Sequence, residues 1–129
     1  MKREEWERYR RQARHTLDSA RRDQAVGDHD WACFKAQQAA ELAVKGFVRA
    51  TRRFVTGHSV VKLLAESETQ VPAAILDCAR ELDKVYIPSR YPDAYDWGSP
   101  MDYYRETDAQ KAIACAASVL EWLDALAAA

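Results

Sequence analysis

The sequence has little of what interrupts or cross-links a chain. It holds only four glycines and four prolines in 129 residues, and the stretches between them are rich in Ala, Leu, Glu, Arg and Gln, which favour helices. The cysteines Cys33, Cys78 and Cys115 lie far apart and form no Cys-x-x-Cys motif, which argues against a disulfide framework and against a zinc site. We interpret them as small core residues in a reducing cytosol.

An excess of charge of one sign is also missing. The formal net charge is -1 and the pI is about 6.3, so the chain as a whole does not attract nucleic acid, and any such role would depend on a local patch. No apolar run is long enough to cross a bilayer, and the polar N-terminal segment is unlike a signal peptide. These features predict a cytoplasmic protein that makes no membrane contact.

Common catalytic motifs are absent as well. The sequence contains no Gly-x-Ser-x-Gly, no glycine-rich phosphate loop, and no pair of histidines or carboxylates at metal-ligand spacing. We therefore expect neither a metal nor a cofactor. A function has to be carried by single polar side chains of helices and loops.

Apolar residues that recur every three or four positions predict five helices and no strands. The expected helices cover residues 3–25, 28–53, about 59–66, 72–86, and 107 to near the C-terminus. Gly27 as a C-terminal cap, Asp28 or Asp30 as an N-terminal cap, and a capping box from Thr107 to Gln110 mark their ends. Short connections make successive helices antiparallel, which predicts an all-α fold: an up-and-down four-helix bundle with one additional short helix, in one domain over residues 1–129.

The helix expected at residues 28–53 carries a stripe of small residues. Such residues let two helix backbones approach closely, so we expect this helix to run through the middle of the bundle. The stripe consists of Ala32, Ala36, Ala39, Ala43, Gly46 and Ala50. Bulk to either side is expected from Phe34, Leu42, Phe47 and Phe54.

A polar row lies beside this stripe, formed by Gln37, Gln38, Glu41 and Lys45. Glu41 and Lys45 have the favourable i to i+4 orientation, which is worth about 0.3 to 0.5 kcal/mol if exposed. Two interpretations stay open. The row is either a solvated face that stabilises the helix, or a set of side chains that satisfies polar groups buried in the bundle or at a dimer interface.

The loop expected at residues 88–106 holds Arg90 between Pro88 and Pro92. The prolines restrict the backbone on both sides, so a planar cation is held on a short, stiff scaffold where it can meet a phosphate or a carboxylate. In one interpretation Arg90 faces a ligand, with Tyr91, Asp93 and Asp83 beside it. In the other, Arg90 pairs with Asp83 or Asp93 and pins the loop to the preceding helix.

Two further features favour structural interpretations. His58 follows Gly57 at the start of the third expected helix, and no neighbour in sequence fixes its tautomer, which favours a residue that hydrogen-bonds locally over a catalytic one. The helix expected at residues 3–25 has a row of arginines interleaved with acidic residues, which favours a mixed solvated face over a phosphate-binding stripe. The row comprises Arg8, Arg11, Arg14, Arg21 and Arg22.

Four segments in order resemble the HEPN domain. They are residues 34–45 (FKAQQAAELAVK), 57–64 (GHSVVKLL), 82–93 (LDKVYIPSRYPD) and 108–112 (DAQKA), the last of them ahead of Trp122. The resemblance extends over almost the whole chain, from Trp6 to Trp122. It implies an all-helical bundle that usually dimerises.

The resemblance also implies two functions. Prokaryotic HEPN proteins are encoded beside a minimal nucleotidyltransferase and form a two-component complex with it, often a toxin and antitoxin pair. Many HEPN domains are instead metal-independent RNases that use an arginine and a histidine separated by four to six residues. Arg90 matches that arginine, whereas Tyr95, Asp96 and Trp97 stand where the histidine is expected. Tyrosine, with a pKa near 10, serves poorly as a base near neutral pH. Arg90 is therefore the first catalytic candidate, and His58 and Tyr95 are weaker ones.

We therefore predict a non-catalytic HEPN module that binds a nucleotide or nucleic-acid phosphate near Arg90 and acts with a minimal nucleotidyltransferase. Gln38, Glu41 and Lys45 are included among the predicted ligand-binding residues. An RNase toxin that uses Arg90 and a purely structural dimer are the alternatives. Four tryptophans and six tyrosines are more aromatic surface than a core of this size easily hides, which supports a homodimer.

Overall fold

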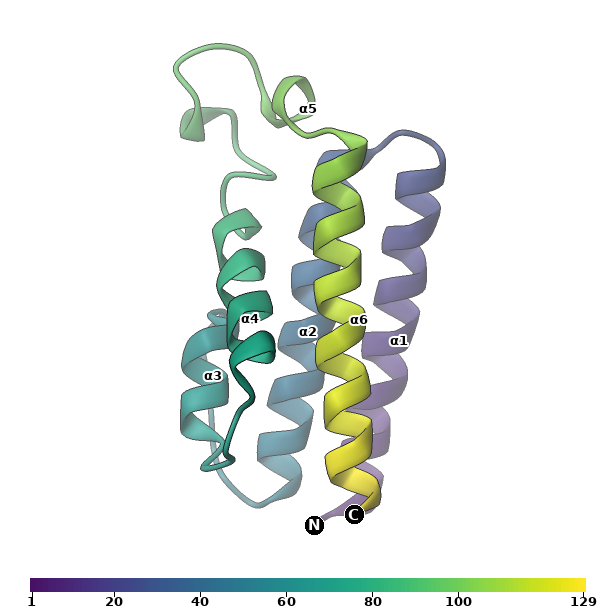
Figure 1. Cartoon of the computed structure of the whole chain (residues 1–129), viewed down its shortest axis with the longest axis vertical. Helices are drawn as coiled ribbons and strands as arrows, with labels where there is room; N and C mark the ends of the chain where they lie inside the picture. The colour runs from purple at the N-terminus through teal and green to yellow at the C-terminus, as the bar shows by residue number, and fades with distance from the viewer.

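Four long helices pack side by side in the computed structural model, which describes all 129 residues. They are α1 (Arg3–Ala25), α2 (His29–Ala50), α4 (Ala73–Val85) and α6 (Glu106–Ala128), and they alternate in direction along the bundle (Figure 1). The short α3 (Val60–Glu66) lies beside α4, and both chain ends lie at the same end of the bundle. The predicted all-α, up-and-down bundle with an extra short helix is confirmed.

The number of helices and some of their ends were predicted wrongly. The segment expected to be a loop contains a 3-10 turn, η1 (Pro92–Ala94), and a sixth α-helix, α5 (Pro100–Tyr103). Each begins at a proline, whose fixed φ suits the first helical turn. Helix α2 ends at Ala50, short of residue 53, because Arg52 adopts a left-handed backbone with φ of 67°.

The capping box predicted at Thr107 is also wrong. Helix α6 begins one residue earlier, where the Asp108 carboxylate accepts a hydrogen bond of 2.9 Å from the backbone N–H of Arg105. An aspartate there satisfies a free N–H and also stabilises the positive end of the helix dipole, so it is the stronger cap. The expected bulk of Phe54 is likewise missing from the core, because its side chain is 85% exposed.

The small-residue stripe of α2 is buried, as its pattern predicts. Its closest approach is at Gly46, where an added Cβ would lie 2.1 Å from Cβ of Tyr9 on α1. A helical glycine costs about 1 kcal/mol relative to alanine, so the close packing of α1 on α2 has to offset that cost. Two backbones can meet at this point only because the residue has no side chain.

The cysteines fit their interpretation as core residues. Cys33 and Cys115 are buried, and Cys78 is half-buried. Burial raises the pKa of both Cys33 and Cys115 to about 12, so both thiols stay protonated at neutral pH. No helix combines the length and apolar character needed to cross a bilayer.

We predict that Gly46→Ala lowers the free energy of unfolding by about 1 to 3 kcal/mol, because the new methyl group forces α1 and α2 apart. Chemical denaturation measures the change. Ser118→Ala, on the exposed face of α6, controls for the intrinsic helix preference of alanine and should leave stability nearly unchanged. A Gly46→Ala protein as stable as the parent would contradict the close contact.

Candidate functional site

Arg90 lies against aromatic rings from two helices and its own loop. Its guanidinium carbon is 4.2 Å from the ring centre of Phe34 on α2, 4.7 Å from that of Tyr86 at the end of α4, and 4.9 Å from that of Tyr91. Its Nε donates a hydrogen bond of 3.1 Å to the backbone oxygen of Tyr86. Cation-π contacts and this bond hold the guanidinium in one orientation.

The backbone before Arg90 is fixed by a buried serine. Ser89 is fully buried, and its hydroxyl donates to the backbone oxygen of Val85, the last residue of α4. The N–H of Arg90 then donates to the oxygen of Ile87 at 3.1 Å. The chain therefore continues in a tight turn after α4, which places Arg90 one turn beyond Tyr86.

The internal ion pair that one of the two interpretations gives Arg90 does not form. No carboxylate oxygen lies within 4.0 Å of its guanidinium, and Asp93 is exposed in η1. Asp83 is already used: it accepts hydrogen bonds from the hydroxyl of Ser59 at 2.6 Å and from the N–H of Val60 at 2.7 Å. A carboxylate that caps the positive end of α3 has no need of a second partner.

The polar row of α2 is buried, so the interpretation as a solvated face is wrong. The side chains of Glu41 and Lys45 are 8% and 15% exposed, and Lys45 Nζ lies 2.9 Å from Glu41 Oε2. Gln37 is completely buried, and its amide donates both to Glu41 Oε1 at 3.3 Å and to the backbone oxygen of His58 at 2.8 Å. Gln38 donates to the side-chain oxygen of Gln37 at 2.7 Å. We name Gln37, Gln38, Glu41, Lys45 and His58 the Glu41 network.

His58 has a distant partner rather than a local one, so that expectation is also wrong. Its Nδ1 lies 3.2 Å from Glu41 Oε1, and its ring stacks on Tyr86 with the centres 4.9 Å apart. A carboxylate accepts hydrogen bonds, so this contact suits a proton on Nδ1 and leaves Nε2 without a hydrogen-bond partner in the chain. The His58 side chain is 59% exposed. Arg90 and His58 thus contact the same Tyr86 ring.

A shallow hollow of about 130 Å³ lies among His58, Ser59, Asp83 and Tyr86. Ligand pockets for whole small molecules measure about 300 Å³ or more, so this hollow accommodates only one small group of a ligand, and its lining includes the Asp83 carboxylate but not Arg90. Tyr95 is engaged elsewhere: its ring stacks on Tyr103 at 4.2 Å. Burial raises the pKa of the adjacent Tyr104 well above its ordinary value, and Tyr95 adds to that shift.

Phe34 and Tyr86 are site residues that the sequence does not mark as such. Both read as inward-facing bulk, and only one signal points to more: Tyr86 stands four residues before Arg90, one helical turn away. Gln37 and Lys45 make no contact with Arg90. They bind Glu41, which in turn binds His58. No group of three or more His, Cys, Asp or Glu side chains is placed to hold a metal ion.

Comparison with known proteins gives a consistent result. The HEPN domain model matches residues 6–126. Among solved structures, TT1696 from Thermus thermophilus is 40% identical, with a TM-score of 0.90 over 96% of this chain and 98% of that one. The archaeal HEPN homologue ST0689 is 44% identical, with a TM-score of 0.82 over 94% and 96%.

A third solved structure, the HEPN domain protein tm0613 from Thermotoga maritima, is 32% identical, with a TM-score of 0.77 over 94% of this chain and 98% of that one. A search of curated proteins gave no match. All three relatives are covered almost end to end, and the residues that the family model matches include the segment around Arg90.

We predict that Glu41→Ala lowers the free energy of unfolding by about 3 kcal/mol, because it leaves the largely buried ammonium of Lys45 without a carboxylate and removes one of two acceptors from the amides of Gln37 and Gln38. Denaturant titration measures the loss. Glu81→Ala is the matched control: Glu81 pairs with Lys84 and Lys111 at the surface, so its removal should cost less than about 1 kcal/mol. Equal small losses in both variants would contradict a structural role of the Glu41 network.

Proposed function

The chain belongs to the HEPN domain family, and we propose that it is a non-catalytic HEPN module that binds a nucleotide or nucleic-acid phosphate at Arg90. One observation carries the proposal: Arg90 is held in place by aromatic rings while its charge has no carboxylate partner. A guanidinium that is fixed but not neutralised is ready to form paired hydrogen bonds with a phosphate. The Arg90 side chain is already ordered, so binding a ligand costs it little further conformational entropy.

The surroundings of Arg90 suit part of a nucleotide. The small hollow beside Tyr86 has room for one group of a ligand whose phosphate lies at Arg90, and Tyr91 adds a ring that is 47% exposed. A base can stack on such a ring whatever its identity. The site of one chain alone is therefore small for a whole nucleotide, and a second copy of the chain would enlarge it.

A homodimer and a minimal nucleotidyltransferase partner, as in two-component toxin and antitoxin systems, are part of the proposal. Large apolar side chains stand exposed on the segment that follows Arg90: Trp97 is 72% and Met101 is 74% exposed. Clustered apolar surface of this kind is typical of protein interfaces. The family resemblance supplies the class of partner.

A metal-independent RNase is the second candidate, and the geometry of His58 favours it. The buried Glu41 orients the ring and leaves Nε2 open, beside the same Tyr86 ring that Arg90 contacts. A neutral imidazole can take the proton of a 2′-hydroxyl near neutral pH, and Arg90 would stabilise the phosphate. Tyr95, which stacks on Tyr103, is the poorer candidate for this role.

We expect Arg90→Ala to weaken binding of ATP and of a single-stranded RNA by about 10-fold or more, because a charged hydrogen bond contributes roughly 1.5 to 3 kcal/mol. Calorimetry or fluorescence anisotropy measures the affinity. Arg90→Lys should retain part of it, since the charge remains but the planar fork is lost. Circular dichroism verifies that both variants fold, and a folded Arg90→Ala protein that binds both ligands like the parent would refute the proposal.

RNase activity separates the two candidates. Under the leading proposal, purified protein leaves transfer RNA and messenger RNA intact in the presence of a chelator. Cleavage that disappears in both His58→Ala and Arg90→Ala would replace the binding module with the RNase. Cleavage that survives His58→Ala would exclude His58 as its base.

A further inference from the structure

Cationic side chains gather along one side of α1 and at the adjoining end of α2. Hollows follow one another there and share residues. One of about 380 Å³ includes Lys2, Arg49, Arg52 and Arg53, and the next, of about 440 Å³, joins Lys2 to Arg8. A third, of about 490 Å³, joins Arg8 to Arg11, Gln12 and His15. We name Lys2, Arg8, Arg11, Arg49, Arg52 and Arg53 the α1 cationic band.

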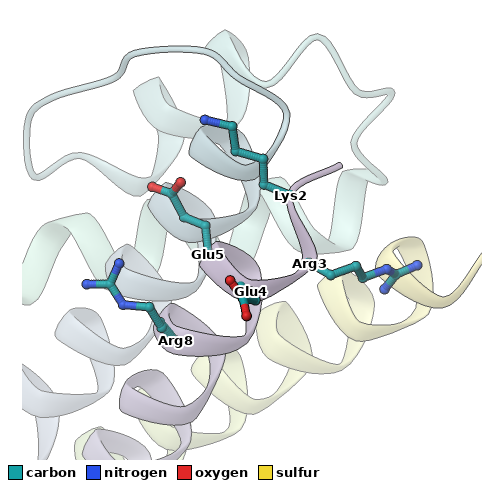
Figure 2. Close-up of a pocket in the computed structure, with 5 residues that line it drawn as sticks. All are labelled: Lys2, Arg3, Glu4, Glu5 and Arg8. Atoms are coloured by element: carbon teal, nitrogen blue, oxygen red, sulfur yellow. The ribbon is translucent and has the colours of Figure 1, made fainter.

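The side chains at the start of α1 do not all belong to this band. Figure 2 shows Lys2, Glu5 and Arg8 pointing to the same side of the helix, whereas Arg3 points to the opposite side. Glu4 and Glu5 both line the hollow that joins Lys2 to Arg8, so two carboxylates share this surface with the cations of the band. The six cations of the band outnumber these two carboxylates.

Most charges of the band are not neutralised within the chain. Lys2, Arg8, Arg11, Arg49 and Arg52 form no ion pair, and Arg53 has a single surface partner, Glu68. Other arginines of the same helix are used internally: Arg10 and Arg14 both bind Asp124 on α6. The expectation of a mixed solvated face therefore holds for part of α1 only. In a chain of net charge -1, this concentration of free positive charge is local.

An aromatic ring stands at one end of the band. Phe54 is 85% exposed, and the guanidinium carbon of Arg49 lies 5.9 Å from its ring centre. The guanidinium of Arg49 is itself held by the hydroxyl of Tyr9 and the backbone oxygen of Val55, whereas Lys2 and Arg52, which line the same hollow as Phe54, form no ion pair. Proteins that bind single-stranded nucleic acids combine such an exposed ring, on which bases stack, with cations that contact the phosphates. A peptide made of acidic residues alone would contact the cations but has no side chain that stacks on the ring.

The length of the α1 cationic band indicates how large a ligand it can bind. From Lys2 to His15 the helix rises about 20 Å at 1.5 Å per residue, which is too long for one nucleotide and suits a chain of phosphates. The band is also separate from Arg90, because α1 lies on the opposite side of the bundle from α3 and α4 (Figure 1). We propose that the α1 cationic band is a second nucleic-acid site, distinct from the phosphate site proposed at Arg90, and that it holds the backbone of a single-stranded RNA.

The test compares a fluorescein-labelled 15-nucleotide oligouridylate with ATP as probes. Each lost phosphate contact on a single strand reduces the salt slope of log K by about 0.7, so Arg8→Ala/Arg11→Ala should reduce it by about 1.4. At 0.1 M salt this corresponds to roughly 10- to 30-fold weaker oligonucleotide binding. ATP affinity, which depends on Arg90, should stay unchanged. Phe54→Ala should weaken the oligonucleotide by at least about 5-fold, through the loss of stacking.

Arg21→Ala/Arg22→Ala removes the same charge from the far end of α1 and is the matched control; it should leave oligonucleotide binding near the parent value. Three results would overturn the band: an unchanged affinity and salt slope in Arg8→Ala/Arg11→Ala, an equal loss in the control, or equally tight binding of an oligoglutamate peptide. Loss of ATP binding with a functional band would instead refute the role of Arg90. Binding of ATP through Arg90 with a band that fails the test would leave the proposed function intact.

Discussion

The buried carboxylate of Glu41 is the charge around which the candidate site is arranged. An ion taken out of water costs several kcal/mol unless donors surround it, and Glu41 receives them from Lys45, two amides and the ring of His58. Gln37 connects this charge to the main chain, because its amide also binds the backbone oxygen of His58. Movement of the segment between α2 and α3 would therefore break the hydrogen bonds that His58 makes with Gln37 and Glu41 and would take one donor from a buried carboxylate. The position of His58 beside Tyr86 follows from that constraint.

A second carboxylate determines what Arg90 can do. Asp83 lies on α4, seven residues before Arg90, and a simple local pairing would neutralise the guanidinium. The free N–H groups at the start of α3 and the hydroxyl of Ser59 take that carboxylate instead. Arg90 is left with aromatic faces, one backbone oxygen and the hydroxyl of Tyr91, which orient it without cancelling its charge. Because Asp83 caps the start of α3, the guanidinium of Arg90 stays available to a ligand.

The fold could be predicted from sequence because its information is local. Periodicity placed the four long helices, and the small residues of α2 indicated a close approach that Gly46 makes with Tyr9. The short η1 and α5 escaped prediction because prolines in a loop and prolines in a first helical turn look alike. The site was harder, because its contacts join residues far apart: His58 meets Glu41 across 17 positions, and Ser59 meets Asp83 across 24. Local sequence can suggest that Arg90 is stiffly held, but not which carboxylates have other partners.

The arginines of α1 have two different roles, and their positions around the helix explain which arginine has which role. Successive residues are rotated by about 100°, so Arg8 and Arg10, two positions apart, project to nearly opposite sides of the helix. Arg10 and Arg14 share the side that faces α6, where burial alone would raise the pKa of Asp124 but their hydrogen bonds outweigh it and lower that pKa. Arg8 and Arg11 lie on the side that faces solvent, where no carboxylate meets them. The arginines of α1 therefore fall into two sets. Arg10 and Arg14 are neutralised where α1 meets α6, whereas Arg8 and Arg11 leave positive charge at the surface. The net charge of the chain does not reveal this division, and only the tertiary structure distinguishes the two sets.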